Sequence, residues 1–347
     1  MALLWIDGFE NYGTVTGSAP SPAGIVSRSY PTVGGESTFR VRAGRLAGYA
    51  LDLFTSSSYI GIVSLTTVDT VVAGFAVKFS AFYSDATFFA LYDGTTLGVN
   101  LHLQNSGEIA VKRGTTLLAT SSGANIALNT WYYIELKVKC HATAGTYELR
   151  VGGVDVCSDI DGDANTKAGS NAYHNGFRFI GIGITAYAMV DDFYFLDSSG
   201  AINNDFLGNS RVVAIRPTGD VGTPEFTPDS GDNYSRVNEA ICGDDSNYVE
   251  ADTTDEKDLY DYGALGGVLS TITGIVVTTD CRETDATNFD LKTVCKSGAT
   301  ESDDAGQAVG STSYVTRRRI IETNPNTVSD PWTPTTLEAA QFGIKIG

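Results

Sequence analysis

The segment from residue 129 to residue 157 alternates between apolar and polar side chains, and this alternation restricts the chain to a β-sheet fold. Ile134 and Leu136 fall on one side of an extended chain, whereas Glu135 and Lys137 fall on the other. A period of two is the pattern of a strand with one buried face and one face in water. The segment therefore predicts strands that cover a hydrophobic core on one side only.

The same segment contains a predicted hairpin. Residues 147–151 alternate in the same way, and Gly152 and Gly153 follow them. Two glycines suit a tight turn with positive φ, so we expect the chain to return as a strand from Val154. The segment is thus predicted to be a meander of antiparallel strands.

Further strand candidates follow one another at a spacing of roughly ten residues. Short turn signals such as Asp93-Gly94 and Ser106-Gly107 separate them. Many short strands with frequent turns are typical of an all-β sandwich, in which two facing sheets enclose the core. The candidates are residues 59–63, 71–79, 88–93, 97–103, 109–113, 176–184 and 190–196.

Short motifs add a resemblance to a known fold. Trp131 opens the alternating segment, residues 4–10 read Leu-Trp-Ile-Asp-Gly-Phe-Glu, and residues 189–197 read Met-Val-Asp-Asp-Phe-Tyr-Phe-Leu-Asp. Together they resemble the concanavalin A-like or laminin G-like jelly roll, with residues 4–10 as its first strand and residues 189–197 as its closing strand. With Asn-Asn-Asp-Phe-Leu-Gly at 203–208, the combination resembles a family of tailed-phage virion proteins with a lectin-like N-terminal domain. The resemblance implies an all-β fold and a structural role in a virion.

Length and charge distribution indicate two domains. A chain of 347 residues is long for a single core. Residues 1–200 contain 17 acidic and 12 basic residues, a net charge of −5, whereas residues 201–347 contain 24 and 11, a net charge of −13. We therefore expect a jelly roll over 1–200, a linker over 201–208 and a second, smaller β-sandwich over 209–347. The elements expected in the second domain are strands at 211–215, 272–278, 289–295, 314–321 and 342–346, and a helical turn at 337–340.

The net charge of −18 narrows the classes of partner. An acidic chain repels the phosphates of nucleic acids and the anionic surfaces of membranes, so neither is an expected partner. Asp7 interrupts the apolar start of the chain, and no basic segment precedes it, so no signal peptide is recognised. We expect synthesis in a host cytoplasm and a final location in the virion.

The five cysteines are expected to be reduced. They stand at positions 140, 157, 242, 281 and 295. Their count is odd, and no Cys-x-x-Cys pair occurs. This pattern favours free thiols over a disulfide framework. Cys140 and Cys157 end neighbouring strand candidates, so a disulfide between them stays open as an alternative.

One run has the composition of a calcium site. Asp159, Asp161 and Asp163 place carboxylates at alternate positions, as in loops that surround Ca²⁺. The run departs from the EF-hand pattern because Ser170 stands where the bidentate Glu is required. The alternative is an acidic loop between strands, whose Asp side chains stabilise turns. The three aspartates are the predicted calcium ligands, and no other cofactor is expected.

Two further charged groups have alternative interpretations. Arg40, Arg42 and Arg45 form a short basic patch in an acidic chain, which is either a solvated strand face or a docking site for an acidic partner surface. Asp191 and Asp192 stand in the closing strand candidate. They are either a carboxylate pair with a function or charges that protect a strand edge from pairing.

The sequence does not contain the residues of a glycosidase. Glucanases share the concanavalin A-like fold, and their catalysis needs two carboxylates about 5 Å apart on one strand face. Glu135 and Glu148 stand singly among Lys and Arg, and the pairs beginning at Glu256 and Glu283 lack a second Glu. His102 lies between two leucines, which favours a structural role. The chain is therefore predicted not to be an enzyme.

These observations predict a bacteriophage virion structural protein, either a head decoration or cement protein or a surface appendage, with a lectin-like domain that can bind glycans. The alternative is a receptor-binding adhesin at a tail fibre or tail tip, and a glycan-degrading enzyme is the third choice. An adhesin needs an exposed aromatic cluster, for which Tyr83, Phe88, Phe89 and Tyr92 are candidates, half of them core by alternation. The expected partners are other virion proteins, host-surface glycans and further copies of the chain, with residues 13–35 as an interface arm.

Overall fold

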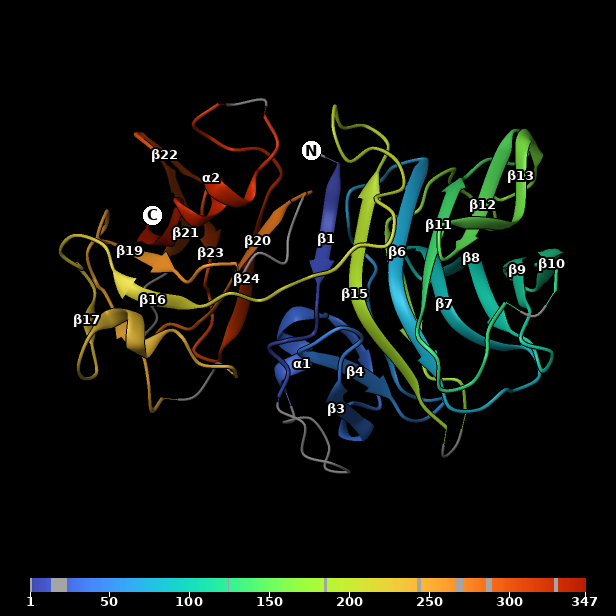
Figure 1. Cartoon of the computed structure of the whole chain (residues 1–347), viewed down its shortest axis with the longest axis horizontal. Helices are drawn as coiled ribbons and strands as arrows, with labels where there is room; N and C mark the ends of the chain where they lie inside the picture. The colour runs from blue at the N-terminus through green and yellow to red at the C-terminus, as the bar shows by residue number, and fades with distance from the viewer. Residues whose placement is uncertain are drawn as a thin grey trace. The chain divides into compact units, whose positions relative to one another are not determined.

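The chain is nearly all β and antiparallel, and it divides into two compact units, residues 1–213 (unit 1) and residues 214–347 (unit 2). Figure 1 shows the strands of both units. The division differs from the expected linker, because residues 201–208 belong to unit 1. The computed structural model describes residues 2–13, 24–123, 125–183, 186–241, 245–265, 271–284, 289–327 and 330–347.

Unit 1 is a sandwich of two antiparallel sheets, as the alternation predicted. Sheet A runs in the order β13 (Val154–Ala164), β12 (Gly145–Val151), β11 (Tyr132–Lys139), β6 (Thr70–Phe79), β15 (Ala188–Asp197), β4 (Tyr49–Leu53) and β3 (Phe39–Ala43), with β1 (Leu3–Asp7) also paired to β15. Sheet B runs in the order β10 (Thr116–Thr120), β9 (Ile109–Arg113), β8 (Thr96–Leu103), β7 (Ala86–Asp93), β14 (Gly176–Ile180), β5 (Tyr59–Ile62) and β2 (Thr32–Gly34). The chain crosses repeatedly between the two sheets, in the manner of a jelly roll.

Phenylalanine rings from both sheets fill the space between them. Phe75 and Phe193 belong to sheet A, whereas Phe89 and Phe179 belong to sheet B. The ring of Phe179 lies 5.0 Å from that of Phe75 and 4.8 Å from that of Phe193, edge to face in both cases. All four rings are fully buried. Burial of one such side chain contributes about 1.5–3 kcal/mol, so this aromatic layer holds the sheets together.

The predicted hairpin after residue 151 is confirmed. Gly152 and Gly153 have φ values of 60° and 83°, the left-handed region that side chains with a Cβ rarely adopt. They connect β12 to β13, which begin within a few residues of the expected positions, but β13 continues to Ala164 through the acidic run that was expected to be a loop.

One face that was expected to be in water is covered instead. The segment of residues 201–213, called the strap below, lies on the outer face of sheet A. The amide of Gly208 donates to Glu135 Oε1 at 2.8 Å, and the amide of Leu207 donates to the hydroxyl of Tyr194 at 3.1 Å. Glu135 is only 1% exposed as a result. The expected strand at 211–215 is absent from the strands that the structure describes there; Val212 binds Asp192 of sheet A, whereas Ile215 packs against the core of unit 2.

Unit 2 is a smaller β structure with two layers. Its main sheet contains β16 (Pro217–Asp220), β19 (Lys257–Tyr262), β25 (Gln341–Ile346), β21 (Asp290–Ser297), β22 (Thr300–Asp303) and β23 (Gln307–Ala308). Two-stranded ribbons are formed by β17 (Thr227–Pro228) with β18 (Val249–Glu250) and by β20 (Ile275–Cys281) with β24 (Val315–Ile321).

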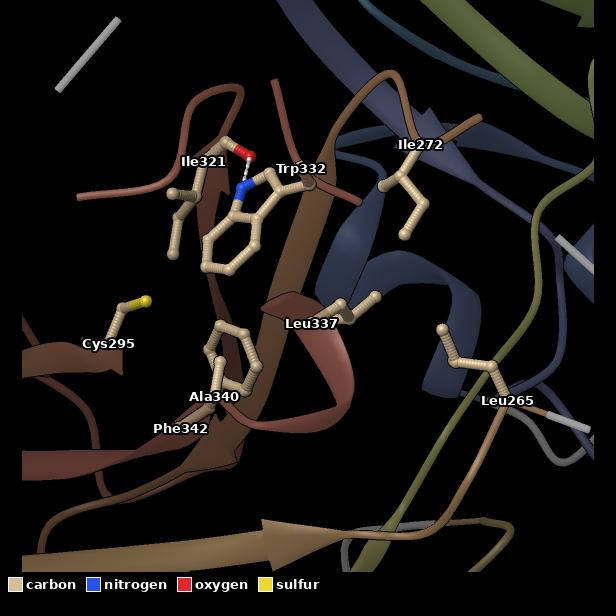
Figure 2. Packing of buried hydrophobic residues seen from close by; sticks show 8 residues of the cluster. All are labelled: Leu265, Ile272, Cys295, Ile321, Trp332, Leu337, Ala340 and Phe342. Carbon is tan, nitrogen blue, oxygen red and sulfur yellow. Dashed lines mark hydrogen bonds between the residues drawn. The ribbon is translucent and has the colours of Figure 1, made fainter. Parts of the chain in front are cut away.

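The ribbon of β20 and β24 packs against the main sheet through a compact core (Figure 2). Trp332 is 2% exposed, and its indole N–H donates to the carbonyl of Ile321 at 3.2 Å. Leu337 enters from the helical turn α2 (Pro334–Glu338), which Thr333 caps. The helical turn expected at 337–340 thus begins at residue 334 and contributes to the core.

Candidate functional site

The outer face of sheet B carries a row of polar side chains that crosses the sheet. The strand registers place Lys112, Asn100, Ala90, Arg178 and Gly61 opposite one another on β9, β8, β7, β14 and β5. Arg178 therefore stands between two residues with little or no side chain. This spacing leaves its guanidinium group room beside the strands that flank it.

Two tyrosines hold the guanidinium group of Arg178. Its Cζ lies 5.0 Å from the ring centre of Tyr59 and 4.5 Å from that of Tyr92, so cation–π contacts fix it on both sides. Gly34 permits this arrangement, because a Cβ at that position would lie 2.2 Å from the Tyr59 ring. Arg178 Nε is buried and has no hydrogen-bond partner among the residues that the structure describes.

A hydrogen-bonded cluster lies beside this stack on the same face. His102 Nε2 lies 2.5 Å from Asn100 Oδ1 and 3.1 Å from Thr87 Oγ1. Burial lowers the pKa of His102, so the imidazole is neutral near pH 7. Lys112 pairs with Asp85, and this hydrogen bond lowers the pKa of that carboxyl. The cluster therefore presents neutral donors and acceptors with one neutralised ion pair.

His174 completes the face. The His174 ring lies over Gly98 of β8. A Cβ at position 98 would lie 2.5 Å from His174 Nε2, so only glycine leaves space for the ring. His174 is 1% exposed, and burial lowers its pKa to about 4. Its Nδ1 has no hydrogen-bond partner within the described ranges.

This arrangement suits binding better than bond cleavage. Amide, hydroxyl, imidazole and guanidinium groups donate to and accept from hydroxyl groups, and tyrosine rings offer apolar surface. Asp85 pairs with Lys112 and His102 rather than with a second carboxylate. The pair of carboxylates required for glycoside hydrolysis is not present in this cluster.

Sequence reasoning did not single out Arg178 or Tyr59. They lie far apart in the chain and become neighbours only because β14 pairs with β5. Tyr92 was a candidate in the aromatic cluster, and it does lie on this face. Phe88 and Phe89 are both core, because a register irregularity near Thr87 turns two consecutive side chains inward.

The basic patch is divided by the structure. Arg45 is internal, with Nε donating to Asp192 Oδ2 at 2.8 Å and a side chain that is 9% exposed. It also donates to the carbonyl of Ser210 in the strap, at 2.5 Å. Arg45 therefore fastens the strap, whereas Arg40 and Arg42 stand on the outer face of sheet A.

The edge-protection interpretation of the acidic pair is wrong. Asp191 and Asp192 belong to β15, which pairs with neighbours on both sides and is not an edge strand. Both residues are buried beside a register irregularity with a φ of 51° at Asp192, and their carboxyl groups face Arg45 and the strap. Asp192 Oδ1 accepts the amide of Val212 at 2.8 Å, so the pair binds Arg45 and the strap.

The three aspartates predicted to bind calcium lie in β13, the end strand of sheet A, rather than in a loop. Asp161 and Asp163 are exposed. Slight burial and the neighbouring Asp163 and Asp161 raise the pKa of Asp159. Within the described ranges no three His, Cys, Asp or Glu side chains are grouped as a metal site.

The described cysteines are free thiols. Cys140, Cys157 and Cys295 are buried, and Cys281 is partly buried. Burial raises the pKa of the first three to about 11 and that of Cys281 to about 12. Cys242 lies outside the described residues.

Comparison with known proteins gives distant similarities in structure alone. No family model matches the sequence, and no curated protein matches it. The cellulose-induced protein Cip1 has a TM-score of 0.35 and 14% identity, over 46% of this chain and 84% of its own. Domain 4 of AbnA, a GH43 extracellular arabinanase from Geobacillus stearothermophilus in complex with arabinotriose, has a TM-score of 0.37 and 14% identity, over 56% and 93%.

The binding domain of Paraclostridial Mosquitocidal Protein 1 has a TM-score of 0.41 and 13% identity, over 56% of this chain. The chain spans about half of that domain, 48% of its length. Similarities this distant carry no inference of activity for this chain. None of the helices in the described part is long and apolar enough to cross a membrane.

Proposed function

We propose that unit 1 is a carbohydrate-binding domain and that the sugar binds to the outer face of sheet B around Arg178. The observation that carries this proposal is the guanidinium group of Arg178, held between Tyr59 and Tyr92 on a side chain that is only partly buried. A donor that is fixed in place before binding loses little conformational entropy when a ligand oxygen reaches it. Sugar hydroxyl and carboxylate oxygens are acceptors of the required kind.

Asn100 orients His102, which supplies a neighbouring polar contact in this proposal. Both are nearly or fully buried, and both are already oriented by hydrogen bonds within the sheet. Sites that recognise small polar ligands combine a few oriented polar groups with aromatic surface, as this face does. We propose no catalytic step, because the acidic side chain of the cluster, Asp85, is paired with Lys112.

For the whole chain we propose a virion structural protein of a tailed phage, in a decoration, cement or appendage role. The support is the resemblance of residues 4–10, 189–197 and 203–208 to that family, together with the acidic composition. A tail adhesin is the alternative, and it uses the same sugar-binding face. Other virion proteins and host-surface glycans are the proposed partners.

Sugar binding is tested by titrating the full chain against a panel of neutral and acidic oligosaccharides. Arg178→Ala is expected to weaken binding about 10- to 100-fold, since a hydrogen bond to a charged group contributes about 1.5–3 kcal/mol. Lys139→Ala, which removes a cation from sheet A, is the matched control. If no sugar binds, or if both variants bind equally well, the proposed site is wrong.

The virion proposal is tested separately on purified phage particles. Antibody labelling and mass spectrometry of intact and mildly stripped particles are expected to find the chain on the head or on an appendage. Labelling confined to the distal tail tip favours the adhesin. Absence of the chain from particles overturns the virion role without affecting the sugar-binding proposal.

A further inference from the structure

Sheet A has chemically opposite ends. It begins with β13 and finishes with β3, and Figure 1 shows these strands on opposite sides of unit 1. The end near β3 carries basic side chains, whereas β13 carries acidic ones. The two groups were separate motifs in the sequence, and the sugar-binding proposal uses neither.

The outer face of sheet A from β3 to β6, called the basic end below, contains three cations and one carboxylate. Strand registers place Arg40, Asp52, Met189 and Lys78 side by side across β3, β4, β15 and β6. Arg42 Nε donates to Asp52 Oδ2 at 2.5 Å. Because Asp52 is fully buried, the outward surface of this end is positive within a chain of net charge −18.

Aromatic rings hold these cations in place. Arg40 Cζ lies 3.5 Å from the ring centre of Phe54, and Lys78 Nζ lies 5.0 Å from that of Trp131. Asp52 Oδ1 is buried and has no hydrogen-bond partner among the described residues, so the carboxylate is not saturated by the cations around it. Cations fixed in this way dock an anionic surface with a small loss of side-chain entropy.

The acidic end is uncompensated and carries apolar side chains. Burial and the other two aspartates are the main causes that raise the pKa of Asp159, and no cation acts on it to a comparable extent. On the same strand Val154 is 64% exposed and Ile160 is 66% exposed. Large apolar side chains on an end strand are typical of a surface that pairs with another chain.

We propose that the basic end of sheet A docks the acidic end of sheet A in a second copy of this chain. The charges of the two surfaces are complementary, which favours this pairing. Two acidic ends repel each other, as do two basic ends, so a symmetric dimer through like ends is disfavoured. The contact is therefore heterologous, and repeated copies form a closed ring or an open row according to the rotation between them.

Charge reversal at each end provides the experiment, with sedimentation velocity of the full chain as the measurement. The wild type is expected to self-associate with rising concentration, and less at high salt, where exposed charges are screened. The variant Arg40→Glu with Lys78→Glu and the variant Asp159→Lys with Asp161→Lys and Asp163→Lys are each expected to stay monomeric. An equal mixture of the two variants is expected to associate again, because each reversed end meets its opposite.

Lys292→Glu with Lys296→Glu changes the charge by the same amount as the basic-end variant, but on β21 of unit 2, and is the control for that variant. Its association is expected to match the wild type. Circular dichroism first establishes that each variant is folded, and only then is its sedimentation result compared with that of the wild type. A wild type that stays monomeric at its solubility limit, basic-end variants that associate like the wild type, or a mixture that does not associate would each overturn the proposal.

Discussion

The hydroxyl of Tyr194 donates to Glu135 Oε1 at 2.6 Å, across a glycine of the strand between them. Gly74 on β6 pairs with Glu135 on one side and with Tyr194 on the other. The ring of Tyr194 lies over Gly74, and a Cβ there would come within 2.2 Å of it. The same carboxylate then accepts the amide of Gly208, so this contact holds the strap.

Gly74→Ala is expected to destabilise unit 1 by about 1–3 kcal/mol, because the added methyl group displaces a packed ring. Urea denaturation followed by tyrosine and tryptophan fluorescence measures this change. Gly219→Ala is the control, since a Cβ at Gly219 meets no atom within 4 Å. Equal stability of the two variants would show that the ring moves aside without cost.

Tyr194→Phe is expected to cost about 1–3 kcal/mol of unfolding free energy, because Glu135 loses a buried hydrogen bond. The backbone amides of the strap are then less protected from hydrogen exchange with solvent. Hydrogen exchange of residues 201–213 is expected to accelerate, while exchange in the aromatic layer between the sheets changes little. Uniform acceleration throughout unit 1 would contradict a specific role in fastening the strap.

Acid is expected to remove the stabilising contribution of His174. Its pKa is about 4 in the folded chain and 6.5 in its unperturbed form, so the unfolded state binds the proton at higher pH. The contribution is complete above pH 6.5 and is lost as the pH falls toward 4, which amounts to about 3 kcal/mol. Asp93 lies near enough to raise the pKa slightly and limits the effect.

The test of this prediction is the difference in stability between the wild type and His174→Gln from pH 7.5 to pH 4. This difference is expected to shrink on acidification. The total stability is less informative, because burial raises the pKa of Asp191. Protonation of that carboxyl on acidification stabilises the folded chain, whereas protonation of His174 destabilises it. A difference that does not change with pH would contradict the prediction.

The four described thiols are expected to react slowly with a disulfide reagent at pH 8, because their raised pKa values leave little thiolate. Cys242→Ser removes the fifth thiol, so rapid labelling in that background is expected to be absent until urea is added. Fast labelling of the folded variant would show an accessible thiolate. Mass spectrometry before and after reduction tests the alternative disulfide between Cys140 and Cys157.

Calcium binding by Asp159, Asp161 and Asp163 stays a prediction with a direct test. If these residues bind Ca²⁺, EDTA lowers the melting temperature of unit 1, and Asp161→Asn reduces that difference. A melting temperature that is the same with Ca²⁺ and with EDTA leaves the three carboxylates as the acidic surface of β13.

The sequence predicted the local structure well and the non-local contacts poorly. Alternation located β11 and β12, and a glycine pair located the turn before β13, because these signals act within a few residues. Glu135 was expected in water, since alternation reports which face a side chain occupies and not what covers that face. The strap comes from residues 201–213, more than 60 positions later in the chain.

The candidate site could not be predicted from local sequence patterns, because it too depends on contacts between distant parts of the chain. Arg178 and Tyr59 meet through the pairing of β14 with β5, and the registers that align Arg178 with Asn100 join β14 to the much earlier hairpin of β7 and β8. Asp191 and Asp192 were placed on an edge because periodicity does not reveal the order of strands in a sheet. The basic patch was read as three equivalent arginines, although one of them serves the strap.

The strap also determines which segment of unit 1 a mechanical force reaches first. A pull on residue 214 toward the solvent reaches residues 201–213 before it reaches β15. Under such a pull we expect the bond from Val212 to Asp192 to break before the bond from Gly208 to Glu135, because Val212 is nearer to the pulled residue. About a dozen residues of the strap would therefore detach from sheet A before the force reached the strands of the sandwich.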